Sequence, residues 1–468
     1  MGSADVTNAR SRIGPTPTRA LAEFASQTTR GQVPEIAADA IKRAIVDTLA
    51  VTAAGARTDL AARVAGTLLR PQGDATIIGR SSKADASTAA LVNGVAGHAL
   101  DYDDASFASS AHPSVTLLPP LLALAETRGL PGAAVITAYA VGYQVAVELG
   151  GLLNPSHYAA GWHGTGTIGA LSATFAVGNL LALDTERISV AVALAVAGAG
   201  GLRGNFGTDA KPYQAGNAAR NAVTAGLLAE AGLTGATDIL EAAHGFLEVY
   251  AGDAAAAVPA AWSQPDLWAV VRPGIISKLF PSCASSHTAI AAALELRNRG
   301  LAAGDIRSVE VEMTSLAAGN MRYPNPGTGL EAKFSLQYCV AVALEKGRLT
   351  LDDFTDDAVA GAPKGLMNRI AFARNDELDA FSSSSPTAAR PAVVQVRTIA
   401  GELVSARVDD PPGGAGPIPE ELLIAKIDDC LARADAEFDA RTLIDRVADF
   451  DTIDDVGVLL SGLAPKRR

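Results

Sequence analysis

Cysteine, histidine and aromatic residues are scarce in this sequence of 468 residues, which has 3 cysteines, 6 histidines and 5% aromatic residues. The cysteines, Cys283, Cys339 and Cys430, are odd in number and widely spaced. This spacing excludes a disulfide framework and any CxxC metal site. Because no cluster offers three zinc ligands at the usual spacing, we expect no metal. The cysteine usage fits a reducing cytoplasm.

Basic residues are too few for a partner that carries many negative charges. Lys and Arg total 38 against 50 Asp and Glu, a net charge of −12, which argues against nucleic acid or an anionic membrane as the main partner. Residues 1–20 contain no contiguous apolar run of signal-peptide type, so secretion is not expected. The most apolar windows, 133–153 and 188–202, are predicted to be buried helices rather than membrane spans.

Small and apolar residues are abundant, with 49% hydrophobic residues and 45 glycines. A helical pattern dominates from about Thr18 to Gly252, and each helical run ends at Gly, Pro or a polar cluster. The clearest predicted helices are 35–54, 87–99, 117–127, 133–149, 167–183 and 217–231.

The pattern changes near residues 259–273. The stretch Ser308–Met313 alternates with period two and predicts a strand between helices at 286–298 and 336–346. Residues 392–397 and 402–408 flank a short turn and predict a hairpin, and helices return after a Pro/Gly-rich connector at 409–419. We therefore predict a mainly α protein. An all-helical domain comprises residues 1–268 and 409–468, and a smaller α+β domain, 269–408, is inserted before the C-terminal helices.

One polar stretch combines carboxylates with an imidazole. Asp101, Asp103 and Asp104 are followed by His112, which lies eleven residues after the first of them. A carboxylate next to an imidazole makes an acid–base pair, because the carboxylate raises the pKa of the imidazole and fixes its tautomer. The alternative is a helix end followed by a solvated acidic loop.

A glycine-rich stretch follows His163. Residues 164–170 match GxGxxGA formally, but a dinucleotide site needs this loop directly after a buried strand, and the preceding residues do not predict one. A helix N-terminus is the better interpretation, with free N–H groups around Thr165 and Thr167 available for a substrate carboxylate. A structural role for His163 at a helix start is the alternative.

Two further stretches contain lysines. Lys211 precedes Pro212, so an extended conformation just before a helix is expected, from which the lysine would point into a cleft or simply into solvent. Farther on, Lys278, Cys283 and His287 share a loop that leads into a helix. A Cys283–His287 nucleophile pair is conceivable, but no third residue nearby would orient it, and a structural thiol is the simpler interpretation.

In this order and spacing, these stretches resemble the MmgE/PrpD family, which includes 2-methylcitrate dehydratases, cis-aconitate decarboxylases and iminodisuccinate epimerases. The resemblance covers nearly the whole chain. It rests on residues 47–55, 93–104, 112–114, 161–163, 211–212, 216–220, 278–283 and 329–338. It implies a helical domain interrupted by an α+β domain, a homodimer, no metal or organic cofactor, and an active site between the domains.

The resemblance also implies a reaction. Family members act on small di- or tricarboxylates at a carbon next to a carboxylate, which predicts a cofactor-independent lyase of the dehydratase or decarboxylase type. Carried over by motif, the catalytic residues are Asp101, His112, His163, Lys211 and Lys278, with Thr165, Thr167, Cys283 and His287 as substrate-binding candidates.

One departure concerns the kind of reaction. Cys283 stands where the decarboxylase branch has a histidine, and the 101–112 spacing resembles the epimerase branch. Three alternatives therefore stay open: an epimerase of an iminodisuccinate-like dicarboxylate, a NAD-dependent oxidoreductase, and a catalytically silent carboxylate-binding relative. We expect His163 to be the base and His112, tuned by Asp101, to be the acid, with the lysines binding carboxylates.

Overall fold

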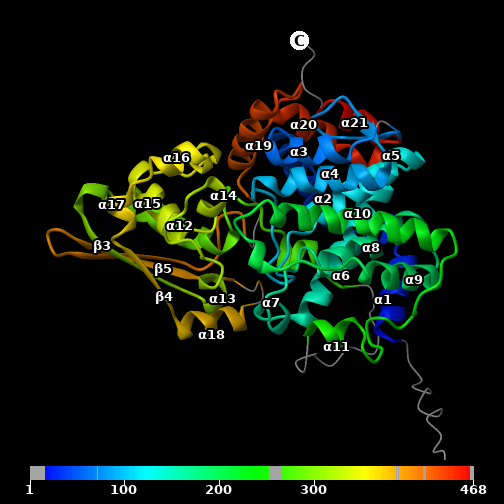
Figure 1. The fold of residues 1–468 in the computed structure, drawn as a ribbon, viewed down its shortest axis with the longest axis horizontal. Helices are drawn as coiled ribbons and strands as arrows, with labels where there is room; N and C mark the ends of the chain where they lie inside the picture. The colour runs from blue at the N-terminus through cyan, green and yellow to red at the C-terminus, as the bar shows by residue number, and fades with distance from the viewer. Residues whose placement is uncertain are drawn as a thin grey trace, which may run out of the picture.

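The structure is a computed structural model that describes residues 16–70, 72–251, 265–385, 387, 389–414 and 418–463. Helices dominate these residues, and the strands form one two-stranded and one four-stranded sheet. Figure 1 shows the helical part on one side of the molecule and the four-stranded sheet with its covering helices on the other. The predicted mainly α class is confirmed.

The helical part joins segments from both ends of the chain. Figure 1 shows the C-terminal helices α19–α21 against the early helices α2–α5, and a single hydrophobic cluster contains residues from Leu21 to Leu463. Its helices are α1 (Pro17–Gln27), α2 (Glu35–Gly55), α3 (Asp59–Leu68), α4 (Ala86–Ala99), α5 (Pro113–Arg128), α6 (Gly132–Leu153), α7 (Ser156–Ala159), α8 (Ile168–Leu180), α9 (Thr185–Val196), α10 (Ala210–Glu230), α11 (Phe246–Ala251), α19 (Glu420–Ala434), α20 (Ala440–Ala448) and α21 (Gly457–Ser461). The small sheet pairs β1 (Ala75–Thr76) with β2 (Lys83–Ala84).

Local sequence explains where these helices begin and end. Pro113 opens α5, where its missing N–H needs no partner, and Gly129 closes it at φ 62°, a left-handed conformation that glycine adopts without steric cost. Helix α6 is long and apolar enough to cross a membrane, but most of it is buried inside the structure. It is therefore the buried core helix expected from its polar residues.

The four-stranded sheet has the order β4-β3-β5-β6, in which only β3 and β4 are parallel. The predicted strand at 308–313 and the predicted hairpin are confirmed as β3, β5 and β6. Sequence reasoning missed β4, a short and mostly exposed strand. The strands are β3 (Ile306–Met313), β4 (Ile370–Arg374), β5 (Ala392–Thr398) and β6 (Leu403–Val408), and the larger helices with them are α12 (His287–Asn298), α15 (Leu336–Lys346) and α18 (Asp376–Ser384).

A second hydrophobic cluster holds this part together. It contains Phe206 and residues between 280 and 406, with Val309, Val311 and Met313 of β3 pointing inward. Ala269 and Val270 pack in the first cluster instead, just beyond the predicted boundary at 268. The domain limits themselves stay a prediction, and residues 415–417 of the predicted connector lie outside the described residues.

Candidate active site

A buried cavity brings together side chains from both parts of the molecule. His112, His163 and Lys211 line it from the helical part, and Cys283 and Arg390 line it from the sheet part. Its volume is about 30 Å³, enough for one or two waters. The remaining lining residues are Ala105, Ser106, Phe107, Ser110, Ala111, Tyr158, Phe206, Ala284, Ser285 and Asn320.

Close packing of α4 against α10 places two of the site's side chains. A Cβ on Gly94 would lie 2.8 Å from the Cα of Gly216, so the two helices touch through their backbones. His98 near the end of α4 and Lys211 at the start of α10 therefore meet, with 2.8 Å between Nε2 and Nζ. The expected extended conformation of Lys211 is wrong. Pro212 sits in the first turn of α10, where a proline needs no N–H partner.

Asp101 binds both lysines. Its carboxylate contacts the Nζ of Lys278 and lies 3.1 Å from the Nζ of Lys211, and Lys278 also donates to the Asp101 carbonyl at 2.9 Å. Asp101 has φ 49°, a left-handed conformation that aspartate tolerates better than most residues. Burial raises the pKa of Asp101, but Lys211 and Lys278 outweigh this and hold it well below its usual range.

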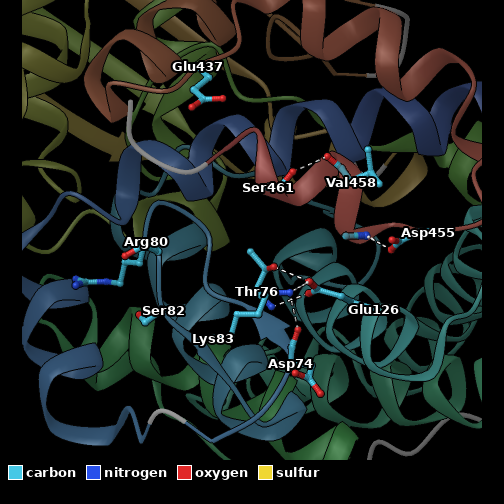
Figure 2. A pocket seen from close by; sticks show the side chains of 12 residues that line it. Asp74, Thr76, Arg80, Ser82, Lys83, Glu126, Glu437, Asp455, Val458 and Ser461 are labelled. Carbon is cyan, nitrogen blue, oxygen red and sulfur yellow. Dashed lines mark hydrogen bonds and ion pairs between the residues drawn. The ribbon is translucent and has the colours of Figure 1, made fainter. Parts of the chain in front are cut away.

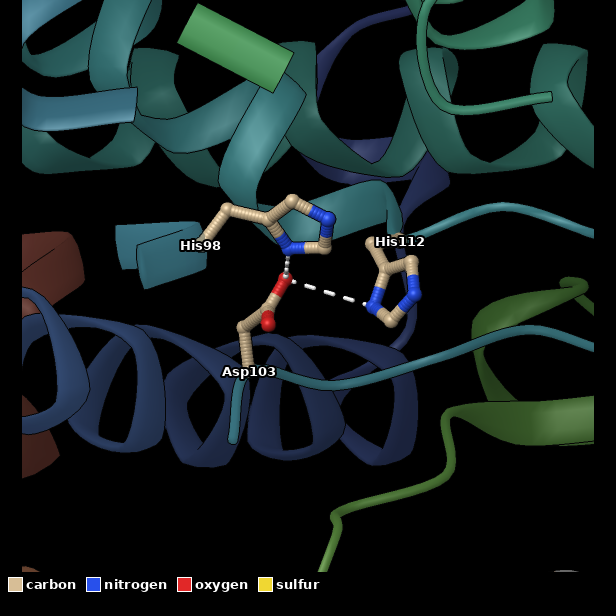
Figure 3. A group of neighbouring side chains, drawn as sticks. All are labelled: His98, Asp103 and His112. Carbon is tan, nitrogen blue, oxygen red and sulfur yellow. Dashed lines mark hydrogen bonds and ion pairs between the residues drawn. The ribbon is translucent and has the colours of Figure 1, made fainter. Parts of the chain in front are cut away.

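The expected pairing of Asp101 with His112 is therefore wrong, and Asp103 takes that place. The Oδ2 of Asp103 lies 2.8 Å from His98 Nδ1 and 3.3 Å from His112 Nδ1 (Figure 3). Sequence reasoning missed His98, although it lies three residues before Asp101 in the same motif. Through its two ring nitrogens, His98 links Asp103 to Lys211.

The same three residues, His98, Asp103 and His112, offer ligand atoms within 4.8 Å of one another and form a geometric candidate for a metal site. Their atoms already bind one another, however, and Lys211 contacts His98. The ammonium groups of Lys211 and Lys278, which contact the adjacent Asp101, would repel a metal ion bound here. The arrangement suits a hydrogen-bonded acid–base network better than a metal.

His163 lines the cavity, and one of its ring nitrogens is buried without a hydrogen-bond partner among the described residues. Its Nδ1 lies 2.6 Å from Gln214 Oε1, and Gln214 Nε2 donates to the Leu202 carbonyl, which fixes the amide orientation. Nδ1 must therefore carry the proton, and Nε2 keeps its lone pair. No described residue gives Nε2 a hydrogen-bond partner. Burial and the charge of Lys211 lower the pKa of His163 well below its usual range, so the ring is neutral and its Nε2 is unprotonated.

His112 is neutral for similar reasons. Its Nδ1 donates to the Asp104 carbonyl at 2.8 Å, which leaves Nε2 as the basic nitrogen. Burial and the charge of Lys278 outweigh the attraction of Asp103 and lower the pKa of His112 to about 3. In the ligand-free protein, His112 is therefore not the protonated acid that the sequence led us to expect.

These protonation states give a testable prediction. The imidazole 15N and 13C NMR signals of His112 and His163 should remain those of neutral, Nδ1-protonated rings from pH 8 down to about pH 5, because burial lowers the pKa of His112 to about 3 and holds the pKa of His163 well below its usual range. Signals are assigned by comparing His112→Asn and His163→Asn proteins. Titration of either ring near pH 6.5 would contradict the tautomers inferred from the geometry.

The hydroxyl groups of the predicted anion-binding loop contact histidines rather than a ligand site. Thr165 Oγ1 accepts the backbone N–H of His112 at 3.1 Å, and Thr167 Oγ1 lies 2.8 Å from His157 Nε2. Neither threonine lines the cavity. The glycines allow tight packing, since a Cβ on Gly164 would lie 2.5 Å from the Ser110 carbonyl oxygen. Helix α7 rather than a strand precedes the loop, so the structure lacks the context that a dinucleotide site requires.

Cys283 and His287 do not form a pair. Cys283 lines the cavity, whereas His287 Nε2 bonds the Ser282 carbonyl at 3.2 Å. His287 and Lys278 are fully buried and lie outside the cavity lining. Of the nine predicted site residues, the cavity lining contains four: His112, His163, Lys211 and Cys283.

A larger cleft of about 980 Å³ lies on the surface of the helical part, and Figure 2 shows its lining. Glu126 there accepts hydrogen bonds from the N–H and hydroxyl of Thr76 and pairs with Lys83 at 2.7 Å. None of the predicted site residues lines it. Glu126 and Lys83 hold the local fold, and the small cavity that contains the predicted residues is the better candidate site.

Two family models match most of the chain. The MmgE/PrpD N-terminal domain matches residues 19–258, and the MmgE/PrpD C-terminal domain matches residues 280–452. The chain belongs to the MmgE/PrpD family. The C-terminal match continues past the sheet into α19 and α20, which pack in the helical core.

Named relatives of this MmgE/PrpD protein are cis-aconitate decarboxylases. The Homo sapiens enzyme is 32% identical over 57% of this chain and 56% of its own length. The Mus musculus enzyme is 30% identical over 68% of this chain and 67% of its own length. The Aspergillus terreus enzyme is 25% identical over 98% of this chain and 97% of its own. These matches support an enzyme of the lyase type.

Proposed function

We propose that this MmgE/PrpD protein is a cofactor-independent lyase that works by acid–base chemistry next to a carboxylate of a small di- or tricarboxylic acid. One observation carries the proposal: the free Nε2 of neutral His163 shares a cavity with Lys211. A base and an ammonium group placed together are what proton transfer next to a carboxylate requires.

The roles follow from the hydrogen bonds. His163 Nε2 takes the proton from the carbon. Lys211 contacts His98 and Asp101 and also lines the cavity, so its third N–H is available to the substrate. Burial outweighs the attraction of Asp101 and lowers the pKa of Lys211, which makes this ammonium a better proton donor. Lys211 then stabilises the developing negative charge, and His112 serves as a second proton-transfer group.

The same groups serve either lyase reaction. In a dehydration, His163 removes the proton and the Lys211 ammonium protonates the departing hydroxyl. In a decarboxylation, carbon dioxide leaves with breakage of the carbon–carbon bond, and the Lys211 ammonium gives a proton to the carbon that keeps the electron pair. Because the named relatives are cis-aconitate decarboxylases, cis-aconitate is the first substrate to test.

Cys283 favours one alternative function. This thiol lies in the same cavity as His163, at the position where the decarboxylase branch of the family has a histidine. A thiol and a base that line one cavity suit an epimerase, which removes a proton on one face of a carbon and returns one on the other. An iminodisuccinate-like dicarboxylate is the substrate of that alternative.

Proton NMR in deuterium oxide distinguishes these reactions. EDTA-treated protein is incubated with cis-aconitate, 2-methylcitrate, citrate, malate and iminodisuccinate, each tested separately. Deuterium in a decarboxylated product identifies the decarboxylase, a new alkene signal identifies the dehydratase, and exchange at the α-carbon without either identifies the epimerase. Inactivity that NAD or a metal ion restores would contradict the proposal, and inactivity under every condition would favour a silent carboxylate-binding relative.

The proposal includes a homodimer in the cytoplasm. The resemblance to the family supports the dimer. The free, buried Cys283, Cys339 and Cys430 suit a reducing compartment.

A further inference from the structure

Arg390 differs from the other buried cations of this protein. The described residues include five buried basic side chains, Lys211, Lys278, Lys333, Arg390 and Lys426. Lys211 and Lys278 pair with Asp101, and Lys426 pairs with Asp47. Lys333 donates to the carbonyls of Leu100 and Pro281. Like Lys333, Arg390 has no carboxylate within 4.0 Å among the described residues, but unlike Lys333 it lines the cavity.

The guanidinium of Arg390 is held but not neutralised. It stacks 4.1 Å from the centre of the Phe107 ring, and its Nη1 donates a hydrogen bond to Ser285 Oγ at 3.3 Å. The side chain is 8% exposed and lines the cavity. An unpaired buried charge is costly. A guanidinium has five N–H donors, so most of those of Arg390 have no acceptor among the residues that the structure describes.

Ser285 extends this donor surface. Its Oγ accepts from Asn320 Nδ2 at 2.9 Å and from Arg390. Both contacts use the oxygen as an acceptor, so the hydroxyl hydrogen is free to donate. Ser285 also lines the cavity. A fork of guanidinium N–H groups next to a hydroxyl donor is a geometry that suits a carboxylate.

We propose that Arg390 and Ser285 bind a second substrate carboxylate, the one farther from the reacting carbon, and so restrict the enzyme to di- and tricarboxylates. This inference rests on the proposed function, which places the reacting carbon near His163 and Lys211. The lysine comes from the helical part and the arginine from the sheet part, so a substrate with two carboxylates bridges both. A cavity of about 30 Å³ is smaller than a tricarboxylate, so binding in this way requires the cavity to widen.

Binding of an unreactive ligand tests this without turnover. Tricarballylate, a saturated tricarboxylate, is titrated calorimetrically into the full-length protein and into Arg390→Met. We expect affinity to fall at least about 30-fold, the loss typical when one partner of a buried charge pair is removed. Arg299→Met is the matched control, since Arg299 is 57% exposed, and its affinity should stay within about twofold.

Butyrate, with one carboxylate, supplies the selectivity test. Its affinity should change less than about threefold in Arg390→Met, because it leaves the second subsite empty. Equal loss for both ligands, or no tricarballylate binding to the unmodified protein, would overturn the inference. In Arg390→Lys, which keeps the charge but lacks the paired N–H groups of a guanidinium, the affinity for tricarballylate should fall about tenfold. In Ser285→Ala, the affinity for tricarballylate should fall about fivefold. These two variants test the inference even if Arg390→Met does not fold.

Turnover separates this inference from the proposed function. If Arg390-dependent tricarballylate binding is found but no substrate reacts, the proposed lyase chemistry is wrong and the subsite stands. If a substrate reacts and Arg390→Met leaves its KM unchanged, the lyase stands and the subsite is wrong. The expected result is a KM raised at least about 30-fold in Arg390→Met.

Discussion

His163→Asn is expected to lower kcat by about 10³-fold for whichever carboxylate the protein converts. General acid–base catalysis contributes roughly 10²–10⁴-fold, and His163 is the side chain whose tautomer is fixed with a free nitrogen in the cavity. Asparagine is similar in size and can still donate to Gln214, but it has no basic nitrogen. KM should change less than about threefold, because the loss falls on the transition state.

The matched control for this variant is His244→Asn. The His244 side chain is 91% exposed and has φ 62°, a conformation that asparagine tolerates. This second protein should keep kcat within about twofold and the same melting temperature. If His163→Asn keeps kcat within tenfold while His112→Asn loses it, the roles of the two histidines are reversed. If both variants keep it, this cavity is not the active site.

The helices and the central strands could be predicted because their patterns are local. The period-two alternation at 308–313 and the hairpin at 392–408 both depend on burial of one face. Strand β4 could not be found in this way, since the sheet partner that recruits it, β3, is distant in sequence and β4 itself is mostly exposed. Tertiary pairing, not its own pattern, makes it a strand.

The sequence could predict several residues of the site, but not which of them form hydrogen bonds and ion pairs with one another. Motif order singled out His112, His163 and Lys211, which the cavity does bring together. The partner of His112 depended on the left-handed turn at Asp101, which directs that carboxylate to the lysines and leaves Asp103 for the imidazoles. Arg390 lies between a serine-rich stretch and a strand, where nothing in the sequence signals a ligand.

Asp101→Asn is expected to destabilise the protein by about 3–5 kcal/mol near neutral pH, because removing one partner of a buried ion pair leaves uncompensated charge. Asp101 is the shared anion of Lys211 and Lys278, which are 5% and 0% exposed. Urea unfolding at pH 7 measures the loss. Asp409→Asn is the matched control, since its pair with Arg407 is about half exposed, and it should cost less than about 1 kcal/mol.

The pH dependence of this loss identifies its cause. In the unmodified protein, the depressed pKa of Asp101 contributes stability above its unfolded pKa, and that stability is lost as pH falls through the folded pKa. In Asp101→Asn, burial without an anion depresses the pKa of both lysines, so the unfolded chain binds more protons than the folded one. The free energy of unfolding of the variant should therefore rise from pH 6 to pH 9. Its difference from the unmodified protein should become smaller over the same range. A deficit that stays constant over this range would show that shape, rather than buried charge, makes Asp101 important.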